Sequence, residues 1–300
     1  MTKAVFTTKV DPTYDDLPEE KYHFPRTYLR QAEAAIGDWI VYYEPRRATG
    51  DLSSRGGRQA YFATARVDRI EPDPTRPEHF YAFVSNYLEF DRPVSFKEGE
   101  RYFENALLRA DGKTNKGAFG RAVRSVSDSE YGLIWHAGFL RTIGEISSAP
   151  AEAGVQSSGF TDEPLTSDRP LIERMVSRPF RDAAFALGVK DAYANTCAMT
   201  GISIINGGGR AEVQAAHIRP VAHDGTDSVR NGLALSGTIH WLFDRGLVSI
   251  DEDYRILVAR GRLPDTVTRM LRDDVLLPKR ADQRPHLLFL RYHRDRIFKG

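Results

Sequence analysis

Two stretches decide the fold of the C-terminal half: "QAAHIRP" at residues 214–220 and "RNGLALSGTIHWLFDRG" at residues 230–246. The second predicts a helix, because Ser236 stands where an N-cap is expected, apolar residues follow at helical spacing, and Gly246 stands where a C-cap is expected. Upstream, "CAMTGISI", "INGGGR" and "AEVQAAHI" indicate two short strands joined by a glycine-rich turn. The predicted order is hairpin, irregular loop and helix.

The predicted helix carries a histidine and an aspartate on one face. Because His240 and Asp244 are four residues apart, they can direct an imidazole and a carboxylate at a common point and ligate one divalent metal ion. The same spacing is also typical of a solvated ion pair. The surroundings favour a site, since His217 ends the predicted strand and Asn231 begins an Asn-Gly turn before the helix.

Together, "CAMTG", "AAHIRP" and "NGLALSGTIHWLFDRGL" resemble the ββα-metal, or HNH, endonuclease family over roughly residues 172–262. The resemblance implies that His217 is the general base that takes a proton from water and that Asn231 holds the loop by backbone hydrogen bonds. It also implies that His240 is catalytic and that, with Asp244, it holds one Mg²⁺, Mn²⁺ or similar divalent ion. A histidine base and a metal ion are the groups that phosphodiester hydrolysis near neutral pH requires.

One position departs from the family pattern. Many members place a further metal ligand immediately before the base, where this chain has Ala216. Three alternatives stay open: only two protein side chains hold the metal, a ligand comes from elsewhere, or His217 is itself a ligand. Candidates for the second alternative are Gln214, Glu212 and His223.

Cysteine content bears on a second kind of metal site. Other members of the wider family hold a structural zinc between paired C-x-x-C motifs, whereas Cys197 is the one cysteine of this chain. We therefore expect no structural zinc. A disulfide within the chain is excluded, and a reducing, cytoplasmic setting is expected.

The N-terminal half predicts a mostly β unit. Aromatic and β-branched runs such as "DWIVYYE", "QAYFATARVDRIE" and "HFYAFVSNYLEF" alternate with turn signals, and "TYLRQAEAAI" and "GAFGRAVRSVSDSEYGLIW" indicate flanking helices. Alternation places Trp39 and Tyr43 on one sheet face and Tyr42 on the other. The fold class expected for the whole chain is α+β, with a twisted sheet or partly open barrel followed by the ββα-metal unit.

The same strands resemble the PUA-like superfamily, which includes SRA, EVE, YTH and ASCH modules, several of which bind a modified base in an aromatic pocket. The resemblance implies that aromatic faces stack on a flipped base and that a basic rim binds the backbone. The pocket candidates are Tyr28, Trp39, Tyr43, Asn86 and Tyr87. The candidate contacts to the DNA backbone are Arg46, Arg47, Arg58 and Arg219. Each aromatic residue can equally be an ordinary core residue.

A basic run after the strands allows two interpretations. In "DGKTNKGAFGRAVRSV", Lys113, Lys116, Arg121 and Arg124 either contact phosphates or lie on a solvated surface helix.

Composition sets the domain organisation. With 300 residues, 41% hydrophobic and 28% charged, and a net charge of +1, we expect a soluble globular protein of two domains that does not associate with membranes. Residues 146–170 are rich in Ser, Ala, Gly and Pro and lack apolar periodicity, which predicts a linker between a reader domain at 1–145 and a nuclease domain at 171–300.

These patterns favour a modification-dependent DNA endonuclease. The expected substrate is double-stranded DNA with modified cytosine, as in phage defence, and a homodimer is expected because one HNH site engages one strand. Two alternatives stay open: a nucleic-acid-binding module without catalysis, for which Ala216 is the best support, and an HNH nuclease that cuts unmodified DNA.

Overall fold

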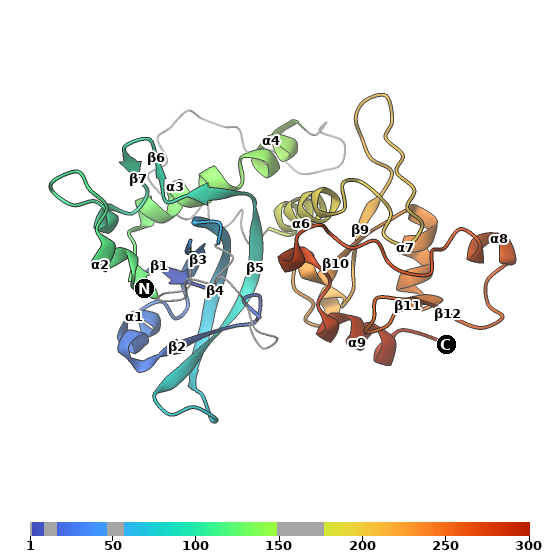
Figure 1. Ribbon diagram of the computed structural model, residues 1–300, viewed down its shortest axis with the longest axis horizontal. Helices are drawn as coiled ribbons and strands as arrows, with labels where there is room; N and C mark the ends of the chain where they lie inside the picture. Colours follow the sequence, from blue (N-terminus) through green and yellow to red (C-terminus); the bar gives the residue numbers. More distant parts are fainter. Residues whose placement is uncertain (1, 9–16, 47–56, 149–176) are drawn as a thin grey trace. The chain divides into compact units, whose positions relative to one another are not determined.

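The computed structural model describes residues 2–8, 17–46, 57–148 and 177–300 (Figure 1). It divides the chain into two compact units, Met1–Ala184 and Phe185–Gly300. The predicted linker lies outside the described residues from 149 onward, so its bounds stay a prediction. Within the described part of the chain, no helix is both long and apolar enough to cross a membrane.

The first unit is built on a six-stranded curled sheet in the order β2-β5-β4-β3-β1-β8. β1 and β3 pair in parallel, and the other neighbours are antiparallel. The strands are β1 (Ala4–Thr7), β2 (Lys21–Pro25), β3 (Trp39–Glu44), β4 (Ala60–Pro72), β5 (His79–Ser95) and β8 (Val123–Ser125). Short elements around it are η1 (Arg26–Tyr28), α1 (Leu29–Glu33), β6 (Lys97–Glu98), β7 (Arg101–Tyr102), η2 (Asn105–Leu107) and α2 (Lys116–Phe119).

Alternation along β3 separates two hydrophobic cores. Trp39 and Tyr43 pack with α3 (Asp128–Gly138) on one face of the sheet, and Tyr42 packs on the other face with residues of α1. This division confirms the prediction from period-two alternation. The curled sheet with flanking helices confirms the expected α+β class.

The predicted helix "GAFGRAVRSVSDSEYGLIW" is three elements. α2 ends at Phe119, β8 pairs antiparallel with β1, and α3 begins only after Ser127. Ser127 accepts a hydrogen bond from the Glu130 backbone N–H, and the Glu130 carboxylate accepts one from the Ser127 N–H. This capping box starts α3, and it is followed by α4 (Leu140–Ser148). A helix across the whole segment is therefore wrong, because tertiary pairing with β1 outweighs local helical spacing.

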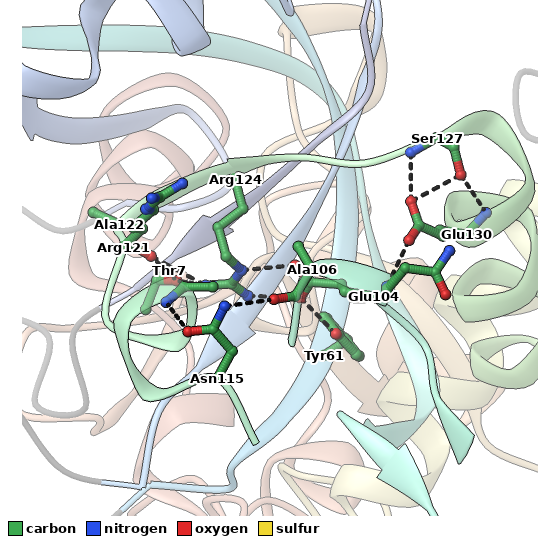
Figure 2. Close-up of polar contacts among 12 residues, drawn as sticks. Thr7, Tyr61, Glu104, Ala106, Asn115, Arg121, Ala122, Arg124, Ser127 and Glu130 are labelled. Atoms are coloured by element: carbon green, nitrogen blue, oxygen red, sulfur yellow. Dashed lines mark hydrogen bonds and ion pairs between the residues drawn. The ribbon is translucent and has the colours of Figure 1, made fainter. Parts of the chain in front are cut away.

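Arg124, weighed as a phosphate contact or a surface residue, is neither (Figure 2). Its guanidinium donates to both carboxylate oxygens of Glu104, at 2.7 and 2.8 Å, and both side chains are almost fully buried. Tyr61 donates to the same carboxylate at 2.6 Å, and Arg124 also donates to the Thr7 hydroxyl at 2.9 Å. Arg124 is thus the centre of a buried network that joins β8, β1 and β4.

The second unit follows the predicted order but pairs its strands differently. The glycine-rich turn forms only a bridge between Ile205 and Ala211. β9 (Gln214–His217) pairs instead with β10 (Gly232–Leu235) across the intervening loop. α6 (Arg178–Ala192) belongs to this unit from Phe185 onward. Further elements are η3 (Val221–His223), η4 (Val229–Asn231), α7 (Gly237–Asp244), β11 (Val248–Ile250), β12 (Ile256–Val258), α8 (Asp265–Thr268), η5 (Ala281–Gln283) and α9 (Leu287–Arg296).

α7 ends as its sequence predicts. Gly246 has a φ of 70°, a left-handed conformation that glycine adopts without strain. Its N–H donates to the Phe243 carbonyl at 2.9 Å. A Cβ at this position would lie 2.0 Å from the Ile297 carbonyl oxygen, so only glycine fits between α7 and the segment after α9.

Candidate active site

The β9–β10 register places His217 directly opposite Gly232. A Cβ on Gly232 would lie 2.4 Å from a Val189 methyl and 3.1 Å from the Phe185 ring. Glycine therefore lets α6 approach the strand pair closely. As a result, the Phe185 ring stacks on the His217 imidazole with centroids 3.8 Å apart and planes 11° apart.

A buried carboxylate contacts the same imidazole. His217 Nε2 lies 2.9 Å from Oδ1 of Asp227, whose side chain is shielded from solvent. Sequence reasoning did not single out Asp227. The only signal is an acidic residue four positions before Asn231, which is as typical of a turn as of a site.

Asn231 holds the loop that carries Asp227 in place by hydrogen bonds to the backbone. The residue is buried, its Oδ1 accepts from the Arg219 N–H at 2.8 Å, and its Nδ2 donates to the carbonyls of Arg219 and Thr226 at 3.0 and 2.8 Å. These three bonds join both ends of the loop between β9 and β10. Residue 231 therefore fixes backbone next to His217 and does not face solvent.

The pair on α7 is held from β9. His240 Nδ1 lies 2.8 Å from Gln214 Oε1, and His240 Nε2 lies 3.5 Å from Asp244 Oδ2. Because an amide oxygen only accepts, Nδ1 donates and Nε2 keeps its lone pair. The Ser236 side chain makes no cap bond; Glu212 accepts the first helical N–H, that of Gly237, at 2.9 Å.

The α7 pair fits a divalent cation. Adjacent ligands of an ion bound at about 2.0–2.2 Å lie about 3.0–3.5 Å apart, and the Nε2–Oδ2 distance is 3.5 Å. The Asp244 side chain is half exposed, which leaves room for water or a phosphate oxygen. Among the described residues, no group of three or more His, Cys, Asp or Glu side chains surrounds a common point. His240 and Asp244 are the ligands that the sequence predicts, and Ala216, which precedes His217, is fully buried in the core.

The two parts of the candidate site lie at opposite ends of β9. Gln214, which contacts the α7 pair, begins the strand, and His217 ends it. Three residues of extended chain place their Cα atoms about 10 Å apart. His217 is hydrogen-bonded to Asp227, and His240 is hydrogen-bonded to Gln214. Among the described residues, no hydrogen bond joins His217 to His240 directly.

Two other predicted residues fold back on the loop after β9. Arg219 donates to the His223 carbonyl at 2.6 Å, and its guanidinium lies 5.1 Å from the centre of the Tyr292 ring. His223 is exposed, and its ring centre lies 6.2 Å from that of Tyr292. Neither side chain is recorded in contact with the α7 pair within the described residues.

The five predicted pocket residues of the first unit do not come together. Trp39 and Tyr43 are buried on the α3 face, whereas Tyr87 is buried on the opposite face and Tyr28 packs at the edge of that core. Asn86 has a φ of 52°, and its side-chain oxygen accepts a hydrogen bond from Arg181. Strand alternation separates them because it sends neighbouring side chains to opposite faces.

The predicted basic rim is only partly described. Arg46 is exposed, and Arg47 lies outside the described residues. Arg58 pairs with Glu44, and its guanidinium lies 4.3 Å from the centre of the Phe62 ring. Arg58 is therefore already engaged within the fold.

Comparison with known families identifies the second unit. The HNH endonuclease family matches residues 197–251. This segment is similar to HNH endonucleases. The matched segment contains β9, β10 and α7. The match confirms the resemblance of this part of the sequence to the HNH endonuclease family.

Solved structures show partial similarity. The modification-dependent TagI restriction endonuclease is 16% identical, with a TM-score of 0.32 over 90% of this chain and 64% of that one. The N-terminal domain of Staphylothermus marinus McrB is 13% identical, with a TM-score of 0.30 over 44% of this chain and 92% of that one. The type IV phosphorothioation-dependent restriction endonuclease ScoMcrA is 14% identical, with a TM-score of 0.20 over 98% and 52%. This chain thus spans about two thirds of the length of TagI and half that of ScoMcrA. No curated protein matches the chain.

Proposed function

We propose that the chain is a metal-dependent endonuclease that hydrolyses phosphodiester bonds of double-stranded DNA and recognises modified cytosine through its first unit. The observation that carries the nuclease assignment is the β9–β10–α7 unit. In it, His217 is held at the end of a strand, while His240 Nε2 and Asp244 Oδ2 lie 3.5 Å apart on one helix face. Restriction of phage DNA that carries methylated, hydroxymethylated or glucosylated cytosine is the role that fits such an enzyme.

Each site residue has a distinct task in this proposal. His217 takes a proton from the attacking water. Asn231 keeps the loop and thereby the imidazole in place through its three backbone bonds. His240 and Asp244 bind a single Mg²⁺, Mn²⁺ or similar ion, which when bound stabilises charge on the scissile phosphate. Gln214 orients His240 by accepting from Nδ1.

The first unit supports a reader role through its aromatic interior. On the face opposite α3, the Tyr42 ring lies 6.0 Å from that of Phe62 and 5.9 Å from that of Tyr87. The Tyr42 hydroxyl is buried with no hydrogen-bond partner among the described residues, and burial raises its pKa well above the ordinary value. An unsatisfied buried donor is costly and favours a polar ligand nearby. The face that carries Trp39 and Tyr43 packs against the 11 residues of α3, and the Tyr42 face packs against the 5 residues of α1. We assign base recognition to the Tyr42 face, which has the shorter helical cover.

A cleavage assay tests the nuclease. Purified full-length chain is incubated with Mg²⁺ or Mn²⁺ and matched plasmids that carry cytosine, 5-methylcytosine, 5-hydroxymethylcytosine or its glucosylated form. His217→Ala and His240→Ala should abolish cleavage, and His136→Ala, a change at an exposed position of α3, should not. Cleavage of all DNAs alike would leave an HNH nuclease without a modification reader. Binding without cleavage would favour the non-catalytic alternative.

A pair of isosteric variants tests the assignment of the reader face. Tyr42→Phe and Tyr43→Phe each remove one buried hydroxyl that lacks a partner in the described structure. The Tyr42 change should reduce the preference for modified over unmodified DNA, measured as a ratio of Kd values, whereas the Tyr43 change should leave that ratio unaltered. The reverse result would move the pocket to the other face.

Cleavage of both strands requires two active sites if one HNH site engages one strand. We therefore propose a homodimer or pairing on DNA. Sedimentation with a modified duplex should show two chains per cleaved site. A monomer that cuts both strands of an isolated site at limiting enzyme concentration would contradict this.

A further inference from the structure

Asp227 is a buried acid against the candidate base, and the proposed function gives it no task. It belongs to the loop between β9 and β10, and its Oδ1 lies 2.9 Å from His217 Nε2. We propose that Asp227 is the positioning residue that fixes the tautomer and orientation of His217, so that Nδ1 accepts the proton of the attacking water. This inference rests on the proposed nuclease activity but is tested separately from it.

The hydrogen-bond chemistry selects one nitrogen. An ionised carboxylate can only accept, so the Nε2–Oδ1 bond requires a hydrogen on His217 Nε2. In a neutral imidazole with hydrogen on Nε2, the lone pair is on Nδ1. Asp227 therefore determines which nitrogen of His217 is the base.

Packing fixes the orientation of the ring. One face of the imidazole stacks on Phe185 at a centroid distance of 3.8 Å, and this approach depends on the absence of a side chain at Gly232. With one face covered and Nε2 engaged, rotation about the side chain would break both contacts. The His217 side chain is still 17% exposed, so a water molecule can reach the ring.

The backbone on both sides of Asp227 is held. The carbonyl of Thr226 accepts from Asn231 Nδ2 at 2.8 Å, and Ser228 on the other side is fully buried and caps η4 by accepting from the Arg230 N–H. The carboxylate is therefore pre-positioned, and holding it against His217 costs little additional conformational entropy. Asn231 supports the base indirectly through the same segment.

The charge of Asp227 also compensates the charge of the protonated base. When His217 takes a proton, the resulting imidazolium and the shielded carboxylate form an ion pair in which the buried charge is compensated. This is the way a carboxylate stabilises the imidazolium of a histidine base without itself becoming protonated.

Hydrolysis of the phosphodiester moves one proton to His217 while one bond to phosphorus forms and another breaks. The proton of the attacking water moves to His217 Nδ1 while the water oxygen forms a bond to phosphorus. The bond from phosphorus to the leaving oxygen breaks, and that oxygen keeps the electron pair and takes a proton from solvent. His217 then releases its proton to solvent, and Asp227 stays ionised throughout.

The first test reads the tautomer without any cleavage. Full-length chain labelled with ¹⁵N-histidine is studied by long-range ¹H–¹⁵N correlation at about pH 8, where an ordinary histidine is neutral, and His217 is assigned by the signals lost in His217→Gln. We expect hydrogen on Nε2 of His217. Hydrogen on Nδ1 would overturn the proposal even if the protein cleaves DNA.

The second test uses Asp227→Asn with Asp224→Asn as the matched control. Asp224 belongs to the same loop, but its side chain is 97% exposed. For Asp227→Asn we expect kcat to fall about 10²- to 10⁴-fold, the range for loss of the carboxylate that orients a catalytic histidine. The Kd for DNA should stay within about twofold. In the ¹⁵N correlation, the hydrogen of His217 in Asp227→Asn should no longer be confined to Nε2, because an amide can donate as well as accept.

The outcomes separate this inference from the proposed function. Unchanged kcat in Asp227→Asn, or a loss of kcat with the hydrogen of His217 still confined to Nε2, would show that Asp227 is a structural residue and overturn the proposal. If the variant does not fold, judged by its melting curve, the tautomer of the unaltered protein decides. Failure of the unaltered chain to cut any DNA would refute the nuclease, while the tautomer would still report on Asp227.

Discussion

The side-chain oxygen of Gln214 lies 2.8 Å from Nδ1 of His240. This bond crosses from the first residue of β9 to the middle of α7 and leaves His240 Nε2 directed at Asp244. An acceptor that binds the N–H of a histidine ligand on the side away from the metal raises the basicity of that ligand and fixes its ring. The hydrogen bond links β9 to the His240–Asp244 pair of α7. Gln214 acts on this pair through His240.

Removal of the amide should therefore weaken metal binding. We expect Gln214→Ala to bind Mn²⁺ about 10- to 100-fold more weakly, measured by titration calorimetry on the full-length chain. Gln214→Glu keeps an acceptor for Nδ1 and should retain most of the affinity. Gln283→Ala in η5 removes an amide away from this pair and serves as the control. Equal affinity in the Ala variant would show that His240 is oriented without Gln214.

Asn231 should be important for stability as well as for the site. Asn231→Ala removes one acceptor and two donors from a buried position, leaving the Arg219 N–H and two carbonyls without these partners. At about 1–3 kcal/mol for a buried group left unsatisfied, the free energy of unfolding should fall by several kcal/mol in total. Urea unfolding followed by circular dichroism measures it. A loss below about 1 kcal/mol would mean that the loop rearranges to satisfy these groups.

Local signals were enough to predict α7 and its pair of side chains. The cap positions Ser236 and Gly246 and the spacing of His240 and Asp244 are properties of consecutive residues, so the sequence alone predicts them. The partner of β9 was missed because β10 lies beyond a long loop, and the glycine-rich turn offered a closer alternative. Nonlocal pairing of this kind depends on packing against α6, which no short pattern reports.

Asp227 and Arg124 show the same limit at the level of single residues. A charged residue in a polar stretch predicts solvent exposure, yet both side chains are buried, because each has a partner distant in sequence. The predicted aromatic pocket does not form for a related reason: strand alternation places Trp39 and Tyr43 on one face of the sheet and Tyr87 on the other. The residues that pack around a buried side chain are set by the tertiary fold, which a local sequence pattern does not report.

The buried ion pair of the first unit gives a third prediction. Arg124→Ala leaves the carboxylate of Glu104 buried with Tyr61 as its remaining recorded donor, and loss of one partner of a buried pair costs about 3–5 kcal/mol. Arg26→Ala breaks an exposed pair with Glu78 and should cost at most about 1 kcal/mol. Denaturant unfolding of both variants tests this difference. Weakened DNA binding at full stability in Arg124→Ala would instead restore its interpretation as a phosphate contact.

His293 gives the second unit a pH-dependent stability. The ring is buried between β11 and α7: Ser249 donates its hydroxyl hydrogen to Nδ1 at 2.8 Å, and Nε2 donates to the Phe243 carbonyl at 3.1 Å. The Phe243 ring stacks on it at 3.8 Å. Burial lowers the pKa of His293 from its ordinary value of 6.5 to about 4. These contacts assign His293 to the core of the second unit.

Because the pKa is lower in the folded state, the unfolded chain binds the additional proton between about pH 6.5 and 4. The stability that neutral His293 contributes is therefore complete above about pH 6.5 and is lost as the pH falls toward 4, by up to about 3 kcal/mol. Melting temperatures at intervals across this range should show the loss in the unaltered chain, with a shallower slope in His293→Gln. His136→Ala on the exposed side of α3 should keep the full slope. A His293→Gln slope equal to that of the unaltered chain would assign the acid sensitivity to other groups.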